Sequence, residues 1–367
     1  MTNAFARIRQ ASLINNRYLK PFSLGATMVL SKSFINRGVD PRKGDQKKWK
    51  RKWRLLFIFL GLLVSLPVIL TGRSLTKQWE SRVIAKTEEE SLLTARLIAR
   101  NVGLQVDEYA RAVEMLARQV EAWGTLEPFV LQKIVTTEKA AFPGLALMYV
   151  GSADGFSIAV DPPFDKFGTP NAGTDYRDRD YYQEVLRTGK TFIGPARMGR
   201  VSHVPNIQIA APIWDTKGQF IAFTEDAIDV FKVIPARVED IVRDTPEIKV
   251  VVLDREGRTL AHPDKAAIEE LRDLSKLPLF QPTTKVNGEL RRGIDETGAA
   301  VHAAVVPVLR RNLNWQVVAY RTEESIKGDI ATARPQVWII TTAALLTGVV
   351  FTALAIWLRR KNPSAEI

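Results

Sequence analysis

Two arginines and three tyrosines lie close together in the segment that begins at residue 175 and reads DYRDRDYYQEVLRTGKTFIGP. Arg179 and Tyr182 are three positions apart, so they share one face if a helix begins there. An arginine presents a planar guanidinium that can bind a carboxylate through two hydrogen bonds, and a tyrosine adds a flat wall and a hydroxyl. Together these side chains suit a small ligand with a carboxylate or another anionic group.

The competing interpretation of this segment is a solvated helix face, on which the arginines pair with Asp175, Asp178 and Asp180. The tyrosines would then pack in the core or at its rim. Among the tyrosines, we expect Tyr182 to face a pocket and Tyr176 to lie outside it. The residue types of this segment are compatible with both interpretations.

The other residue types give little indication of catalysis. His203, His262 and His302 are isolated in the sequence and lack the spacing of metal ligands. The chain contains no cysteine, which excludes disulfides, thiolate metal sites and a cysteine nucleophile. The sequence has no phosphate-loop, dinucleotide-binding or nucleophile-elbow motif. We therefore predict that the protein is not an enzyme and has no catalytic residues, metal site or cofactor; a hydrolase on the outer face of a membrane has no motif to support it.

The elements that would position these side chains follow from the apolar pattern. Residues 73–124 contain no proline, and their apolar residues recur at helical spacing, which predicts a long helix. After it, a hairpin, a helix and a three-stranded meander occur twice in the same order, with the turns SADG and DREG in matching places. We predict an α+β fold in which the long N-terminal helix carries two tandem antiparallel sheet modules, over residues 125–235 and 236–335.

Two apolar stretches, residues 55–72 and 336–358, bracket this region. Each is long enough for a helix to cross the ~30 Å hydrocarbon core of a bilayer. The sequence KKWKRKWR precedes the first stretch and RRK follows the second, and such basic flanks favour the cytoplasmic side. We therefore predict two transmembrane helices, with a cytoplasmic leader (residues 1–54), a cytoplasmic tail (residues 359–367) and both sheet modules outside.

Each apolar stretch has an alternative interpretation. The first could be a signal peptide, but its charged region is too long and TGRSL offers no cleavage pattern. The second could be a buried helix, but it carries no charge and is closed by RRK. The leader accounts for a charge equal to the chain's net +12, which argues against a nucleic-acid partner and predicts a disordered arm attracted to anionic lipid. Met28 could also be the true start.

The segments RDYYQEVLRTGKTFIGP and IAAPIWDTKGQFIAFTEDAIDV resemble the double Cache family of extracytoplasmic sensor domains. That family has a helix with an Arg-x-aromatic-aromatic motif, then Thr-Gly and a strand, then an Ala-x-Pro-Ile strand, a turn and a strand that ends in Ile-Asp. The resemblance is specific over residues 175–230 and extends by architecture over residues 74–335. It implies two PAS-like modules, with an amino acid, amine, carboxylate or purine bound in the membrane-distal one.

Carried over residue by residue, the resemblance implies that Arg179 binds a ligand carboxylate. Tyr181 and Tyr182 stand where the amino-acid-binding subgroup has its Trp-Tyr pair. Asp229 matches the aspartate that binds a ligand ammonium group.

This sequence departs from the amino-acid-binding pattern at two places. Thr174 stands where the subgroup has a tyrosine, and Arg197 falls near the place of a later pocket tyrosine. A pocket that also contained Arg197, Arg200 and His203 would have Asp229 as its only clear acid. This balance favours an anionic ligand such as an organic acid over a plain amino acid.

We therefore predict a two-pass sensor of the bacterial inner membrane, with a periplasmic domain that binds a small carboxylate-bearing ligand. The nine residues after the second apolar stretch are too few for an output module, so we expect a partner protein such as a kinase, cyclase or chemoreceptor. The resemblance also suggests a homodimer through the long helix. The alternative is a structural or adaptor membrane protein whose Cache-like domain binds another protein, which the departures at Thr174 and Arg197 also fit.

Overall fold

The computed structural model describes residues 43–361, and within 43–69 and 333–361 it describes side chains at scattered positions only. Most of the predicted leader, residues 1–42, and the end of the predicted tail, residues 362–367, lie outside the described residues. The chain divides into two compact units, residues 1–60 and 61–367. The described part of the first unit is helical, and all contacts discussed below lie in the second unit.

The predicted long helix is confirmed as part of α1 (Lys43–Trp123). The helix begins earlier than residue 73 because the first apolar stretch continues into it without a break. Along the domain, α1 has one buried face. Its residues recur at helical spacing and include Ile98, Val102, Val106 and Val113. This face makes α1 the support against which the sheets pack.

The two predicted membrane spans fall within helices. Residues 55–72 lie in α1, and residues 336–358 lie in α6 (Glu323–Lys361). Many side chains of both stretches are outside the described set. Among the residues that the structure does describe, no helix combines the length and the apolarity needed to cross a bilayer.

The first of two antiparallel sheets, here called the N-terminal sheet, has the strand order β2-β1-β5-β4-β3. Its module consists of α2 (Pro128–Ala140), β1 (Leu145–Ser152), β2 (Ser157–Asp161), α3 (Asp180–Thr188), β3 (Phe192–Met198), β4 (Pro205–Trp214) and β5 (Phe220–Asp229). α3 ends where Gly189 adopts a left-handed backbone with φ of 64°, which glycine permits. The edge strand β3 contains Pro195 inside a register shift, which an edge tolerates because that proline has no amide hydrogen to donate.

The second sheet, here called the C-terminal sheet, has the order β7-β6-β10-β9-β8, which repeats the order of the first with each number raised by five. Its module consists of α4 (Val230–Val242), β6 (Lys249–Leu253), β7 (Thr259–Ala261), α5 (Lys265–Glu269), β8 (Glu289–Ile294), β9 (Ala300–Val308) and β10 (Trp315–Thr322), with short 3-10 turns at Pro278–Phe280 and Arg310–Asn312. The shared order confirms the predicted repeat and the α+β fold with two antiparallel sheets.

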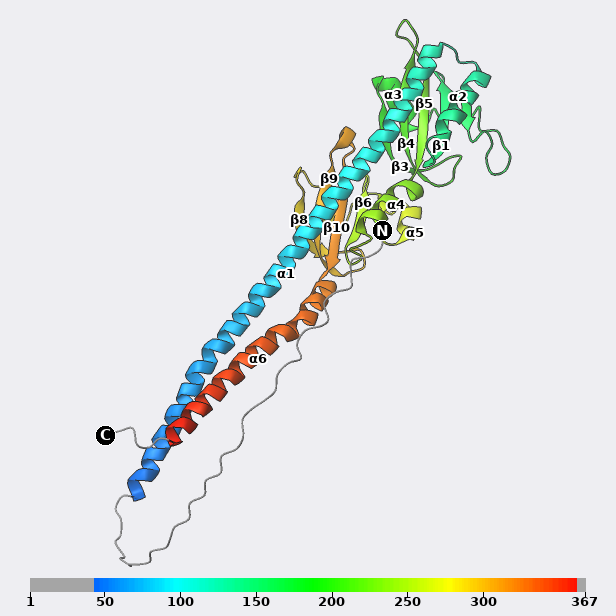
Figure 1. Cartoon of the computed structure of the whole chain (residues 1–367). Helices are drawn as coiled ribbons and strands as arrows, with labels where there is room; N and C mark the ends of the chain where they lie inside the picture. Colours follow the sequence, from blue (N-terminus) through cyan, green and yellow to red (C-terminus); the bar gives the residue numbers. More distant parts are fainter. Residues whose placement is uncertain (1–42, 362–367) are drawn as a thin grey trace, which may run out of the picture. The chain divides into compact units, whose positions relative to one another are not determined.

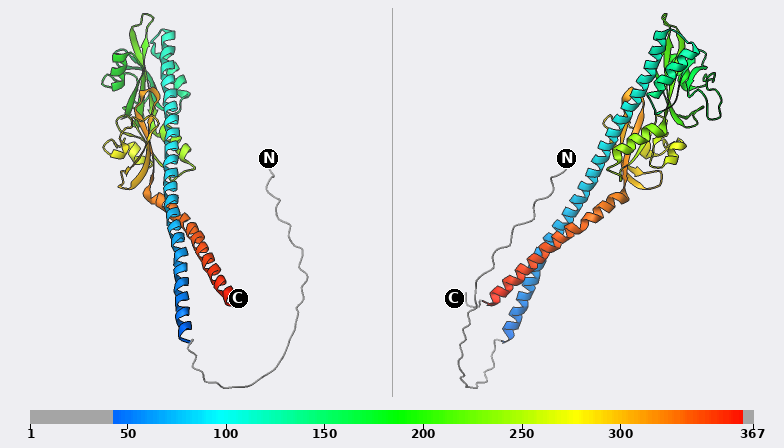
Figure 2. Two further views of the ribbon diagram at one scale, coloured as in Figure 1. Left: turned by 90° about the vertical axis from the view of Figure 1, so that its left-hand side faces the viewer. Right: turned by 45° about the vertical axis from the view of Figure 1, so that its right-hand side comes forward.

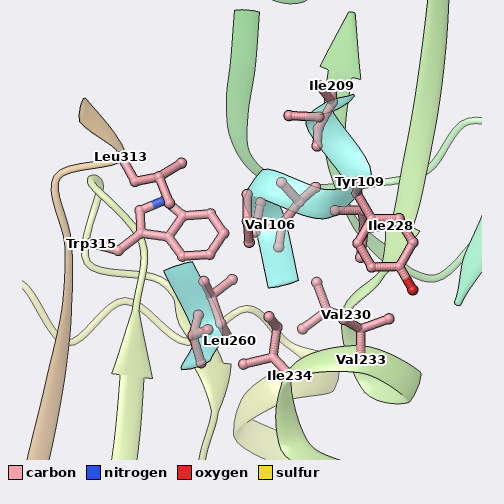
Figure 3. Packing of buried hydrophobic residues seen from close by; sticks show 14 of the residues in the cluster. Val106, Tyr109, Ile209, Ile228, Val230, Val233, Ile234, Leu260, Leu313 and Trp315 are labelled. Atoms are coloured by element: carbon pink, nitrogen blue, oxygen red, sulfur yellow. The ribbon is translucent and has the colours of Figure 1, made fainter. Parts of the chain in front are cut away.

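The helix α1 runs alongside both sheets (Figures 1 and 2). One buried cluster contains residues of α1 and of both modules, so the modules share a continuous core. Figure 3 shows Val106 and Tyr109 of α1 beside Ile228 of the N-terminal sheet, with Trp315 of the C-terminal sheet on the other side of Val106. Ile234 of α4 lies below them in the same cluster. Because one buried cluster contains residues from both sheets, we expect the modules to unfold together.

Candidate functional site

A small cavity lies on the face of the N-terminal sheet that α3 covers. Alternate residues of a strand point to opposite faces, so α1 and α2 pack against one set of side chains and α3 against the other. The cavity measures about 20 Å³, which is room for one water molecule. Its lining comes from β1, β4, β5, the start of α3 and the loop after β3: Leu147, Tyr176, Arg179, Tyr181, Gly199, Arg200, Val201, Ser202, Asn206, Gln208, Glu225 and Ala227.

Arg179 and Tyr181 reach the cavity because of how α3 begins. Arg179 is the N-cap residue of α3 and has an extended backbone, and its side chain makes no capping hydrogen bond. Within residues 43–361, its guanidinium has no hydrogen-bond or ion-pair partner. The Tyr181 hydroxyl lies 3.1 Å from the Tyr149 hydroxyl, which fixes one wall of the cavity.

Tyr176 forms a second wall. Its ring stacks on Tyr149, with ring centroids 4.7 Å apart, and also lies against Tyr181. Burial raises the pKa of Tyr176 well above its usual value, and the charge of Glu225 adds to this effect. The phenol is therefore neutral and offers a hydroxyl to the cavity at any physiological pH.

Glu225 brings an acid into the same cavity. Its side chain is 2% exposed, and its Oε2 atom has no hydrogen-bond partner among the described residues. Burial, reinforced by the neighbouring Asp226, raises the pKa of Glu225 well above its usual value, while Arg179 acts in the opposite direction. A buried carboxyl without a hydrogen-bond partner is costly, and such groups are often retained for function.

Three further buried polar atoms of the lining have no hydrogen-bond partner in the described part of the chain: the Tyr176 hydroxyl, Asn206 Oδ1 and Gln208 Oε1. The two amide oxygens can only accept hydrogen bonds. Together with Glu225 they make the lining rich in hydrogen-bond acceptors. Arg179, in the same lining, supplies hydrogen-bond donors.

The loop after β3 closes the cavity. Arg200 lines it, but its guanidinium points to Asp178, with a nitrogen–oxygen distance of 2.6 Å, and to the backbone carbonyl of Asp175. The pKa of Asp178 is lowered by this hydrogen bond from Arg200. Asn206 donates to the Ser202 hydroxyl at 2.6 Å, which ties the loop to the start of β4.

Four of the six residues proposed from the sequence lie outside the lining. The Tyr182 hydroxyl donates to the carbonyl of Ala153 at 2.7 Å, and its ring packs against Phe223. Asp229 caps α4, where its carboxylate accepts from the amide of Phe231 at 3.0 Å. The expectation that Tyr182 faces the pocket and Tyr176 does not is therefore reversed, since α3 turns Tyr182 towards the turn after β1.

Arg197 and His203 occupy other surroundings. Arg197 makes two hydrogen bonds of 2.8 Å to the carboxylate of Glu256, in the DREG turn of the C-terminal module. In the same turn, Asp254 Oδ2 accepts a hydrogen bond of 2.9 Å from the backbone amide of Ala196. His203 lies exposed in the loop after β3, with a left-handed backbone at φ of 54°. Arg197 therefore joins the two modules and lies outside the cavity lining.

Sequence reasoning missed Glu225, Asn206 and Gln208, although a signal for them exists. The strand IAFTEDAIDV places acids at two central positions of an otherwise apolar run. Alternation puts Phe223, Glu225 and Ala227 on the face towards α3. A charged residue in the middle of a buried strand needs a partner or a function.

No group of three or more His, Asp or Glu side chains in the described part of the chain is arranged to hold a metal ion. The cavity lining contains one carboxylic acid, Glu225, two arginines, Arg179 and Arg200, and neutral polar groups. Such a set can bind the charged ends of a small organic molecule.

Solved structures with the same fold include ligand-binding domains of chemoreceptors. The domain of Pseudomonas fluorescens CtaA, in complex with L-isoleucine, is 15% identical with a TM-score of 0.53, and the match covers 68% of this chain and 98% of that one. The domain of Pseudomonas aeruginosa PctB, in complex with L-Gln, is 18% identical with a TM-score of 0.54. The match covers 70% of this chain and 98% of that one. The periplasmic sensory domain of a Campylobacter jejuni chemoreceptor is 14% identical with a TM-score of 0.54. The match covers 66% of this chain and 98% of that one.

Among curated proteins, none matches the sequence. The sequence profile of the Cache domain family matches residues 76–330, which include the long helix, both sheets and the cavity. The resemblance noted over residues 175–230 is thereby confirmed at the level of the whole domain. The chain belongs to the Cache domain family.

Proposed function

We propose that the chain is a membrane-anchored extracytoplasmic sensor, which binds a small carboxylate-bearing ligand in the N-terminal module and signals through a partner protein. The observation that carries this proposal is the cavity that both Arg179 and the buried Glu225 line. Arg179 would bind the ligand carboxylate through two charge-assisted hydrogen bonds. The stretches 55–72 and 336–358 would supply the membrane anchor.

The cavity lining favours an α-amino acid within this class. The preference for an organic acid depended on Arg197, Arg200 and His203 as pocket residues and on Asp229 as the only clear acid. Of these the lining contains only Arg200, which pairs with Asp178, and its acid is Glu225. Its acceptors call for a ligand with N–H donors, and an ammonium group next to Glu225 would favour the ionised carboxylate. The amino acids bound to CtaA and PctB are in keeping with this choice.

Ligand entry requires movement of the cavity walls, because about 20 Å³ is much smaller than any amino acid. The loop after β3 is a wall that an exposed ion pair helps to hold. Arg200 holds it through Asp178, and both of these side chains are partly exposed. An exposed ion pair contributes about 0–1 kcal/mol, so this contact can open at small cost.

Binding of L-isoleucine is expected to weaken at least tenfold in Arg179→Ala, because the variant loses a charged hydrogen-bond partner worth about 1.5–3 kcal/mol. The matched control is Arg187→Ala, which removes an exposed arginine of the same helix that pairs with Glu184. Isothermal titration calorimetry and the ligand-induced rise in unfolding temperature of the full-length chain measure the effect. Equal affinities of wild type and Arg179→Ala would refute the role of Arg179.

Two analogues of L-isoleucine test each end of the cavity in the same assay. 3-Methylpentanoate lacks the ammonium group, and 2-methylbutylamine lacks the carboxylate. We expect both to bind more weakly than L-isoleucine. The affinity for 2-methylbutylamine should be the same in wild type and in Arg179→Ala, because this amine has no carboxylate for Arg179 to bind. If 3-methylpentanoate binds as well as L-isoleucine, the ligand is a plain organic acid. If no amino acid, carboxylate or amine raises the unfolding temperature, the adaptor alternative replaces the sensor.

A homodimer through α1 is the oligomer that the surface of this helix supports. Leu93, Leu97, Leu104 and Met115 are all exposed. At 100° per residue they fall within about 40° of one another, so they form one apolar stripe on the side away from the sheets. A second copy would bury this stripe against its own.

The double variant Leu97→Glu/Leu104→Glu is expected to sediment as a monomer at concentrations at which wild type is dimeric. Each leucine contributes about 1.5–3 kcal/mol when buried, so their loss weakens association by at least a hundredfold. Leu186→Glu, a change at an exposed leucine of α3, is the control. Analytical ultracentrifugation gives the answer, and a dimer that survives the double variant must use another surface.

A further inference from the structure

A row of basic side chains crosses the C-terminal sheet near the start of α6. His302 of β9 is paired in register with Arg292 of β8 on one side and with Arg321 of β10 on the other. Side chains of directly paired residues point to the same face of a sheet. That face is turned towards α1, because Nδ1 of His302 lies 2.8 Å from Oε1 of Glu88 in α1.

The acids that match this row come from two different helices. Glu88 of α1 accepts from His302 and, at 2.9 Å, from Nη2 of Arg292. α6 supplies Asp329, which lies 2.6 Å from Nη2 of Arg321. It also supplies Glu323, whose carboxylate is 4.0 Å from Nε2 of His302. His302 is thus the member of the row that lies between acids of both helices.

His302 and Glu88 are largely shielded from water, whereas Arg292 beside them is exposed and Glu323 is partly exposed. His302 is 6% exposed, and Glu88 is also mostly covered. Burial acts against a charge on Glu88, but hydrogen bonds from His302 and Arg292 outweigh it and lower the pKa of that carboxyl. Glu88 therefore remains ionised when the pH is near neutral, and arginines remain protonated.

An imidazole is the side chain whose charge ordinarily changes in this pH range. The groups that face it act in both directions. Glu88 and Glu323 favour a positive charge, whereas Arg292 and Arg321 oppose it, and Lys327 holds Glu323 from the other side at 2.8 Å. The neutral ring has one N–H to donate, and the protonated ring has two.

We propose that the C-terminal module senses protons, with His302 as the sensing group. The protonated ring donates Nδ1–H to Glu88 and presents Nε2–H to Glu323, and so holds both α1 and α6 against the same sheet. Loss of one proton to solvent leaves a single N–H, so one of the two helices loses its contact with the ring. This input is independent of the ligand cavity, which lies in the other module.

The separation of α1 and α6 provides the test in the full-length chain. Because the chain contains no cysteine, Glu89→Cys and Ala331→Cys give single, exposed attachment sites on the two helices for nitroxide labels. We expect a narrow distance distribution at pH 5.5 that broadens or shifts at pH 8. The midpoint should coincide with the titration of His302 by NMR, which is resolvable because the chain has three histidines.

His302→Gln is expected to give the pH 8 distribution at both pH values. In Glu323→Gln we expect the imidazole of His302 still to titrate, but the distance between the labels on α1 and α6 should no longer change with pH. His262→Gln is the matched control, since His262 is also buried against a carboxylate, Glu296 at 2.8 Å, but does not lie between α1 and α6. A pH response that persists in His302→Gln, or is lost equally in His262→Gln, overturns the proposal. So does a His302 signal that does not move between pH 5.5 and 8.

Discussion

Replacement of Trp315 by alanine is expected to lower the free energy of unfolding by about 3–5 kcal/mol, the range found when large aromatic residues are removed from cores. Trp315 is 2% exposed at the start of β10. Its ring lies beside Leu313 and faces Val106 of α1 and Leu260 of β7 (Figure 3). The cavity left behind would open in the part of the core that both modules share.

Chemical denaturation followed by circular dichroism measures this effect, and the melting temperature should fall by roughly 10 °C. Trp123→Ala is the control, because Trp123 is 60% exposed at the end of α1 and its loss should change stability by less than about 0.5 kcal/mol. Both modules should still unfold in one transition. Two separate transitions in wild type would contradict the continuity of the core.

The second large effect is a gain of stability in Asp226→Asn. Asp226 has no exposed surface, and its cross-strand neighbours are Met148 and Ile209. Neither of its carboxyl oxygens has a hydrogen-bond partner among the described residues. Burial, with a smaller contribution from Glu138, raises the pKa of Asp226 well above its usual value. The folded chain therefore keeps this proton at a pH at which the unfolded chain has lost it.

The sign of the pH dependence follows from this difference. Below the unfolded-state pKa, near 3.9 for an aspartate, both states are protonated and the stability is complete. As the pH rises, only the unfolded state releases the proton, so the free energy of unfolding falls by about 1.4 kcal/mol per pH unit. The fall continues until the pH reaches the raised pKa of the folded state.

Asp226→Asn removes this contribution, since an amide does not titrate. Between pH 5 and pH 7 we expect the stability of the variant relative to that of wild type to increase as the pH rises. Urea denaturation at several pH values measures the slope. Asp240→Asn, at an exposed site of α4, should leave the slope unchanged. A variant less stable than wild type at pH 7 would mean that Asp226 is ionised in the folded protein.

The elements of the fold were accessible from the sequence because their causes are local. The long helix, α3 with its end at Gly189, and the repeated order of strands all follow from periodicity and turn residues over short distances. The family motif around Arg179 is also contiguous. The cavity was only partly accessible, because its lining comes from β1, α3, β4 and β5, which meet only when the sheet forms.

Two acids of β5 illustrate where the sequence was insufficient. Glu225 and Asp229 both lie in the strand that ends in Ile-Asp, and the family motif drew attention to the second. In the structure Asp229 caps α4, while Glu225 points into the cavity. Alternation could have separated Glu225 from Asp226, but it does not say which face of the sheet carries the ligand site.

By itself, the sequence determined the order and type of the elements, the family and the arginine that begins α3, because these depend on neighbours along the chain. The tertiary structure decided which side chains meet. It paired Arg197 with Glu256, joined Arg179 and Glu225 in one cavity, and set His302 between Glu88 and Glu323. The physical reason is that α1 covers one face of each sheet, and only that packing determines which alternating side chains are buried against it and which are left to line a site.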